Sequence, residues 1–224
     1  MLFVRHATTA GMRAACFPDD GDEADSASLT RAAATLGGLL SERHRAPGPL
    51  TERAGGVAVD SRLVFTAPAR AARQTAIALG CPEPRVCVAL GEADCGRWRG
   101  LPYERVAREE PEALANWPAD PRSAPHGGES PAAHAARVAA WLDSLRGGAL
   151  RDGPGWRETH DGRGAYQTQE VVAVCDVGTI RAALGHALRL DPPAAARFDL
   201  APLSTTELTA TRDGWRVAHV NRKV

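Results

Sequence analysis

Apolar residues follow two alternating patterns along the chain, one typical of buried strands and the other typical of helices. The short apolar runs that predict strands lie at residues 2–4, 63–65, 86–90 and 171–175. The stretches with helical spacing lie at residues 31–43, 67–79 and 178–188. Because strands alternate with helices, we predict a three-layer α/β fold, with a mainly parallel central sheet and helices on both of its faces.

Polar and turn-forming segments separate these elements. The shorter ones lie at residues 17–28, 46–56 and 118–128. Residues 147–169 are polar and glycine-rich without periodicity, which predicts a long mobile loop rather than a domain boundary. We therefore expect a single domain over residues 1–224, a length that can bury a sizeable core.

The second half of the chain carries further signals. A helical hairpin broken at Pro111 is expected over residues 101–117. Ser130 can cap a helix over residues 131–145, because serine is a good N-cap and proline is favoured at the first helical position. An Asp-Gly pair then joins residues 204–211 to 215–220, which predicts a terminal antiparallel hairpin.

Composition and charge narrow the range of partners. The chain has 27 Lys and Arg residues and 27 Asp and Glu residues, so we expect no nucleic-acid partner bound mainly through charge. No stretch reaches the roughly 18 apolar residues that a membrane span needs, so no membrane partner is expected. Arg5 and His6 interrupt the first apolar run, so it is no signal peptide, and we expect a cytoplasmic protein.

Five cysteines are scattered along the chain, and none forms a Cys-x-x-Cys pair. This argues against a disulfide framework and against a structural zinc site. The histidines show no metal-ligand spacing, and no P-loop or dinucleotide-binding motif is present. We therefore expect no metal and no cofactor. The expected partner is a small-molecule substrate, and a homodimer is an open alternative to a monomer.

Ionisable residues follow two of the predicted strands. The first strand is followed by Arg5 and His6, and the run at residues 171–175 is followed by Asp176. In α/β sheets, ligands bind at the carboxyl ends of the strands. An arginine supplies fixed donors for an oxyanion, and a neutral imidazole can act as a nucleophile. Taken alone, an Arg-His pair also fits a surface turn.

Five segments along the chain favour the functional interpretation of the Arg-His pair over a surface turn. They are residues 2–9 (LFVRHATT), 61–76 (ending in RQTA), 90–101 (LGEADCGRWRGL), 125–130 (PHGGES) and 171–181. Together they resemble the histidine phosphatase superfamily, which is also called phosphoglycerate-mutase-like. The resemblance extends over nearly the whole chain except residues 147–169. Residues 117–130 and 201–204 look like those of an actinobacterial branch of that family.

The resemblance implies a mechanism. His6 would attack a phosphoryl group and form a phosphohistidine, and Glu92 would donate a proton to the leaving oxygen. Arg5, a second arginine and a second histidine would bind the phosphoryl oxygens. The other substrate-binding residues expected from it are Thr9, Arg70, His126, Val177 and Gly178.

Two positions depart from the family pattern. Asp176 stands where the second histidine is expected, and Ala71 stands where the second arginine is expected. Two unit charges 4 Å apart interact by about 4 kcal/mol at an effective dielectric near 20, so an aspartate beside a phosphate is costly. Arg70 lies about 100° around the predicted helix from Ala71, so it is no obvious substitute. His126 could approach the pocket instead, and we expect Arg181 to be structural.

Three hypotheses remain open. The chain could hydrolyse a small phosphoester through His6 in a degenerate phosphate pocket. It could instead be a repurposed biosynthetic enzyme, in which His6, Glu92 and Asp176 perform acid–base chemistry on a non-phosphorylated substrate. It could also be a binding or regulatory protein without turnover. Replacement of His6 with alanine discriminates, because a pure binding protein should tolerate it.

Overall fold

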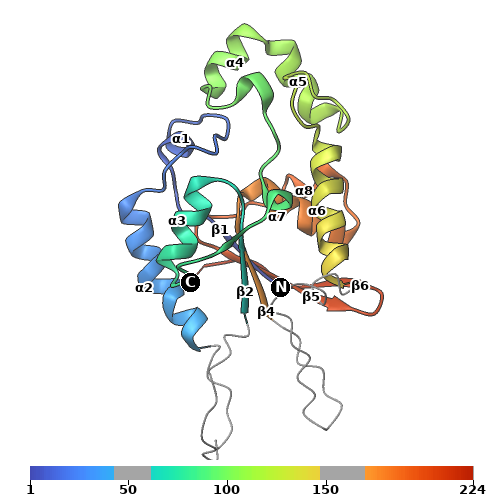
Figure 1. Cartoon of the computed structure of the whole chain (residues 1–224). Coiled ribbons are helices and arrows are strands. Elements are labelled where there is room, and N and C mark those ends of the chain that lie inside the picture. The colour runs from blue at the N-terminus through green and yellow to red at the C-terminus, as the bar shows by residue number, and fades with distance from the viewer. Residues whose placement is uncertain (43–61, 147–169, 224) are drawn as a thin grey trace, which may run out of the picture.

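The computed structural model describes residues 1–42, 62–146 and 170–223, and six strands in these residues form one sheet (Figure 1). The strand order is β3-β2-β4-β1-β5-β6. The strands are β1 (Leu2–Arg5), β2 (Arg62–Thr66), β3 (Arg85–Val86), β4 (Glu170–Cys175), β5 (Thr205–Thr211) and β6 (Gly214–Arg222). Strands β1 to β4 run parallel, and the pair β5–β6 extends the sheet in antiparallel sense. The predicted α/β class and mainly parallel sheet are confirmed.

Strands β1 and β4 lie at the centre of the sheet and pair in parallel, with Val4 beside Val174 and Arg5 beside Cys175. The side chains of Leu2, Phe3 and Val4 are at most 1% exposed. A strand that is covered on both faces needs apolar residues at consecutive positions, which explains the continuous apolar runs in these two segments.

Helices cover both faces of the sheet, with α2 and α3 on one side and α6 and α7 on the other (Figure 1). The helices are α1 (Ala10–Arg13), α2 (Ser26–Glu42), α3 (Arg70–Ala78), α4 (Tyr103–Glu109), α5 (Pro111–Ala119), α6 (Pro131–Arg146), α7 (Val177–Leu188) and α8 (Pro192–Ala195). Helices α4 and α5 lie beyond the end of the sheet from which α3 starts. No helix in the described part of the chain is long and apolar enough to cross a membrane.

Most of the predicted elements are confirmed, but the strand predicted at residues 86–90 is wrong beyond its first residue. Strand β3 ends at Val86, and Val88–Leu90 form a 3-10 helix. Side chains from α6 and α7 bind the carbonyl groups of this segment, so it does not extend the sheet. Helix α2 also begins earlier than expected, and the short helices α1 and α8 were not predicted. The loops predicted at residues 46–56 and 147–169 fall in segments outside the described residues.

A second hydrophobic cluster, separate from the main core, supports α4 and α5. Its buried members are Phe17, Cys95, Trp98, Val106 and Leu114. Trp98 is fully buried, and its Nε1–H donates to the Glu110 carboxylate at 3.0 Å. We call these five residues the cap cluster. Because Cys95 belongs to it, the cap cluster holds the segment around residue 95.

Helix α7 offers a test of the main core. Leu184 is fully buried, whereas Leu188 on the same helix is 44% exposed. We expect Leu184→Ala to lower the free energy of unfolding by about 2–5 kcal/mol, because it leaves a cavity. Leu188→Ala should change it by less than about 1 kcal/mol. Urea denaturation followed by circular dichroism measures both, and equal losses would contradict the packing described here.

Candidate active site

His6 lies at the carboxyl end of β1 and is 5% exposed. Its backbone N–H donates to the Cys175 carbonyl at 3.0 Å, which continues the β1–β4 ladder by one residue. The next N–H, that of Ala7, donates to the Thr75 hydroxyl at 2.9 Å, so α3 also holds this turn. The imidazole therefore projects from a backbone that is bonded on both sides.

The two nitrogens of His6 have different partners. Nδ1 lies 2.7 Å from the Ala7 carbonyl oxygen, and a carbonyl can only accept, so Nδ1 carries a proton. Nε2 lies 2.8 Å from Oδ1 of Asp176. One proton must lie between Nε2 and this carboxyl group, either on the imidazole or on the aspartate. With the proton at either position, Nε2 has no lone pair free for another partner while this contact lasts.

Asp176 follows β4 and precedes α7, so it stands beside His6 at the same edge of the sheet. Burial opposes protonation of His6 most strongly, but the Asp176 charge, its hydrogen bond and the Ala7 carbonyl together raise the pKa of His6. Oδ2 of Asp176 is buried and has no hydrogen-bond partner among the described residues.

Glu92 approaches the same place from the turn that follows the first 3-10 helix. Its Oε1 accepts from the Ala93 N–H and its Oε2 accepts from the Gly178 N–H, both at 2.9 Å. Burial and the nearby Asp176 charge raise the pKa of Glu92, against the opposing effect of His134. A Cβ atom at position 178 would lie 1.9 Å from Oε1, so the close approach of this carboxyl group to α7 requires glycine there.

A small cavity of about 80 Å³ joins these groups. Arg5, His6, Glu92 and Asp176 line it, together with Asp19 and Asp22. Arg5 is the one arginine among the described residues that line it, against four carboxyl groups. Burial lowers the pKa of Arg5, and its guanidinium donates to the Leu200 carbonyl. Carboxyl groups therefore outnumber arginines among the described residues that line the cavity.

A larger cavity of about 780 Å³ lies along α6 and α7 and shares Glu92 and Val177 with the small one. Ala135, Ala139 and Ala182 are among the residues that line it. This second space can receive the part of a ligand that extends away from His6.

Arg70 and His126 do not join this group. Arg70 is exposed and forms an ion pair with Glu23 at 2.6 Å, while the neighbouring Ala71 faces the small cavity. His126 is 2% exposed in the cap cluster, with its ring 4.9 Å from Trp98 and 5.3 Å from Trp117. A histidine that packs against two indoles is held away from the cavity, and neither side chain lines it.

Three other predicted residues lie at the site in less direct ways. Thr9 lines the small cavity, but its hydroxyl accepts from the Met12 N–H and caps α1. Gly178, which was predicted to bind substrate, donates its N–H to Glu92, whereas Val177 lines the cavity. Arg181 donates to the Phe198 carbonyl at 2.9 Å, as a structural arginine would.

Sequence reasoning missed several residues that organise the site. Thr75 supports the turn after His6. Nδ1 of His134 lies 3.9 Å from Oε1 of Glu92, and Arg137 binds backbone carbonyl groups that precede Glu92. Asp19 and Asp22 bring further carboxyl groups to the cavity. The PHGGES motif marked Glu129 but indicated no role for it, and no signal in the sequence pointed to the partners of Arg137.

Among the described residues, no group of three or more His, Cys, Asp or Glu side chains could hold a metal ion. Burial raises the pKa of Cys175 well above its usual value and that of Cys95 to about 12, so both thiols stay protonated at neutral pH.

Comparison with known proteins points to one family. Residues 1–223 match the family model described as histidine phosphatase superfamily (branch 1). No curated protein matches the chain.

Several solved structures are similar over their whole length. One is named mycobacterial hydrolase 1, with 26% identity and a TM-score of 0.74 over 100% of this chain and 98% of that one. Another is a mycobacterial glucosyl-3-phosphoglycerate phosphatase solved with VO3, with 25% identity, a TM-score of 0.72 and the same coverage. A phosphoserine phosphatase mutant from Entamoeba histolytica, 14% identical with a TM-score of 0.72 over 98% of this chain and 95% of that one, shares the fold.

The contact between His6 and Asp176 can be tested by titration. We expect Asp176→Asn to lower the pKa of His6, because the negative charge that favours the imidazolium is lost. A raised pKa stabilises the fold below the unfolded value of about 6.5, and this contribution is lost as pH rises through the folded pKa. The stability difference between wild type and variant should therefore shrink at high pH. Histidine NMR titration and denaturation at several pH values measure this, and an unchanged His6 pKa would contradict the ion pair.

Proposed function

The chain belongs to the histidine phosphatase superfamily, and on this premise we propose that it hydrolyses a small-molecule phosphoester through a phosphohistidine on His6. The observation that carries the proposal is the orientation of His6. Its Nδ1–H is bonded to the Ala7 carbonyl, so Nε2 is the nitrogen that faces the cavity with Arg5 and Glu92. Such a nitrogen can act as a nucleophile once its proton is removed.

The first step transfers the phosphoryl group. Nε2 of His6 forms a bond to phosphorus while the ester P–O bond breaks, and the leaving oxygen takes the proton of Glu92. The raised pKa of Glu92 keeps this carboxyl group protonated closer to neutral pH than an exposed one, as a general acid requires. Arg5 would bind the phosphoryl oxygens.

The second step releases phosphate. Water attacks phosphorus, the bond to Nε2 breaks, and the Glu92 carboxylate accepts the proton of the water. For Nε2 to attack, it must carry no proton and must lose its contact with Asp176, so the aspartate side chain must turn away. A protonated Asp176 could donate a hydrogen bond to a phosphoryl oxygen, where a carboxylate would repel it.

The similar proteins support this reaction class. The mycobacterial glucosyl-3-phosphoglycerate phosphatase was solved with VO3 and also with inorganic phosphate, at 25% identity to this chain. The larger cavity along α6 and α7 would receive the leaving part of the substrate. Its alanine-rich lining favours a substrate with apolar surface.

A second candidate function rests on the bond between Nε2 of His6 and Asp176. With this bond in place and three further carboxyl groups lining the cavity, the site suits a neutral or cationic substrate better than a phosphate. His6, Asp176 and Glu92 would then move protons on a non-phosphorylated substrate.

A phosphoester panel decides between these candidates. We expect purified wild type to release phosphate from at least one ester, and His6→Ala to release none, because the nucleophile is lost. Wild type quenched in base during turnover should carry acid-labile phosphate on His6, which phosphorus NMR detects. Phosphate release that persists in His6→Ala would rule out the phosphohistidine. An inert but folded wild type would favour the acid–base alternative.

Adding positive charge at two positions tests how far the carboxyl groups of the cavity lower phosphatase activity. We expect Ala71→Arg combined with Asp176→His to raise phosphatase activity at least tenfold, because both changes add positive charge next to the phosphate. Tenfold corresponds to about 1.4 kcal/mol in the transition state, well within the electrostatic effect. The control is Arg70→Ala, which removes an exposed charge outside the cavity. A folded double variant without gain would mean that these positions do not face the phosphoryl group.

A further inference from the structure

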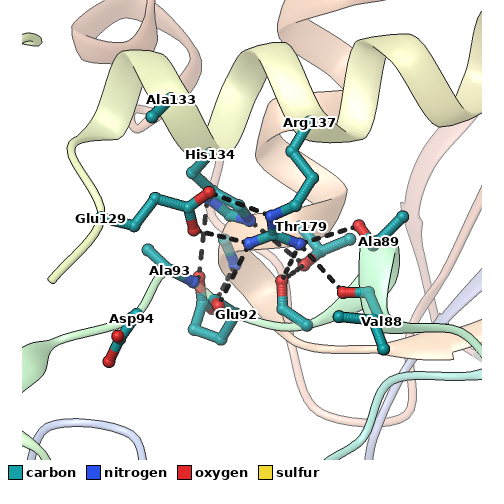
Figure 2. Close-up of polar contacts among 12 residues, drawn as sticks. Val88, Ala89, Glu92, Ala93, Asp94, Glu129, Ala133, His134, Arg137 and Thr179 are labelled. Atoms are coloured by element: carbon teal, nitrogen blue, oxygen red, sulfur yellow. Dashed lines mark hydrogen bonds and ion pairs between the residues drawn. The ribbon is translucent and has the colours of Figure 1, made fainter.

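Side chains from two helices bind the turn that carries Glu92, in addition to the backbone hydrogen bonds of its 3-10 helix (Figure 2). Residues 88–92 present five successive carbonyl groups. Arg137 of α6 donates to those of Val88, Ala89, Gly91 and Glu92, at 3.2, 2.9, 3.1 and 3.4 Å. The Thr179 hydroxyl of α7 lies 3.1 Å from the Leu90 oxygen and 3.0 Å from the Gly91 oxygen. Two side chains therefore reach all five carbonyl groups.

The guanidinium of Arg137 is itself fixed by Glu129. Nε donates to Oε1 at 3.0 Å and Nη2 donates to Oε2 at 2.6 Å, which is a bidentate pair. The side chains of Arg137 and Glu129 are only 26% and 18% exposed. The Glu129 N–H donates to the Asp94 carbonyl at 2.7 Å, so the same residue also holds the chain that follows Glu92. Together, Glu129, Arg137 and Thr179 form a clamp around the turn.

We propose that Arg137, fixed by Glu129, is a positioning residue that holds the Glu92 carboxyl group against the start of α7. The role of Glu92 as proton donor rests on the function proposed above, but the geometric claim does not. The carboxyl group is bonded at both oxygens to backbone N–H groups, so a small shift of the turn breaks these bonds. The clamp prevents this shift, because the carbonyl groups on the opposite side of the turn are bound to a charged, planar donor.

Lysine is the informative replacement at position 137. It keeps the positive charge, but its single ammonium group cannot form the bidentate pair with Glu129 and also reach four carbonyl groups. The matched control is Arg105→Lys, because Arg105 is exposed and pairs with Glu109 at 3.1 Å on the surface of α4. Any effect specific to Arg137→Lys then reflects the clamp.

The first readout is the dependence on the leaving group. An alkyl phosphate needs a proton on its leaving oxygen, whereas p-nitrophenyl phosphate needs almost none. We expect Arg137→Lys to lower kcat at least tenfold on an alkyl phosphate and less than threefold on p-nitrophenyl phosphate, with KM nearly unchanged for both. Arg105→Lys should change neither. Equal losses on both substrates would show a merely structural role and would overturn the proposal.

The second readout does not require turnover. Carbon-13 NMR of the Glu92 carboxyl group should give a lower pKa in Arg137→Lys than in wild type, because a displaced carboxyl group gains water. The charged groups that act on Glu92 are Asp176, His134, Arg5 and Arg137 itself, and lysine at position 137 keeps the positive charge. An unchanged Glu92 pKa in the folded variant would overturn the proposal. A shifted pKa in a protein inert on every phosphoester would keep the clamp and reject the proposed function.

A second variant guards against misfolding. Thr179→Val has nearly the same shape and removes the hydroxyl that binds the Leu90 and Gly91 carbonyl groups and also lies 3.4 Å from Nε2 of His134. We expect it to shift the Glu92 pKa in the same direction as Arg137→Lys, by a smaller amount. If Arg137→Lys does not fold, an unchanged Glu92 pKa in Thr179→Val overturns the proposal.

Discussion

The parallel pairing of β1 with β4 is the constraint on which the site depends. Arg5 lies beside Cys175 in this ladder, so the residues that follow, His6 and Asp176, leave the sheet together. The His6 N–H still bonds to the Cys175 carbonyl, which leaves the two side chains little freedom relative to each other. The continuous apolar sequence of both strands stabilises this pairing, because each strand is buried on both faces. The contact between Nε2 and Oδ1 is thus a consequence of the core.

The charge of the cavity follows from what surrounds this contact. Among the described residues, four carboxyl groups and one arginine line a space of about 80 Å³, and burial strengthens the interaction between His6 and Asp176 there. Two features of the site reduce the negative charge of the cavity. The contact with Asp176 raises the pKa of His6, which favours the imidazolium, and burial raises the pKa of Glu92, which favours its neutral form. Both features place groups with shifted pKa values beside the cavity, as functional sites commonly do.

Glu92 is positioned by a layer of residues that never touch the cavity. Arg137 and Thr179 bind the carbonyl groups before it, Glu129 fixes Arg137, and the cap cluster holds the segment that follows. Figure 2 shows the contacts that Arg137 of α6 and Thr179 of α7 make around this turn. A carboxyl group whose environment is set by so many fixed bonds can keep both its geometry and its protonation state.

Much of the fold and part of the site could be predicted from the sequence alone. Apolar periodicity indicated the parallel strands, the main helices and the terminal hairpin, because an element that packs against a core needs apolar residues at regular intervals along the sequence. Motif order brought His6, Asp176 and Glu92 into one hypothesis, and the structure places all three around one cavity.

The strand predicted at residues 86–90 was wrong beyond Val86, since side chains from distant helices bind that backbone instead. Likewise, the pairing of Arg70 with Glu23 and the burial of His126 between indoles depend on contacts between segments far apart in the chain. Tertiary structure decided these points because a backbone carbonyl looks the same in every sequence, and only the folded chain shows which side chain reaches it.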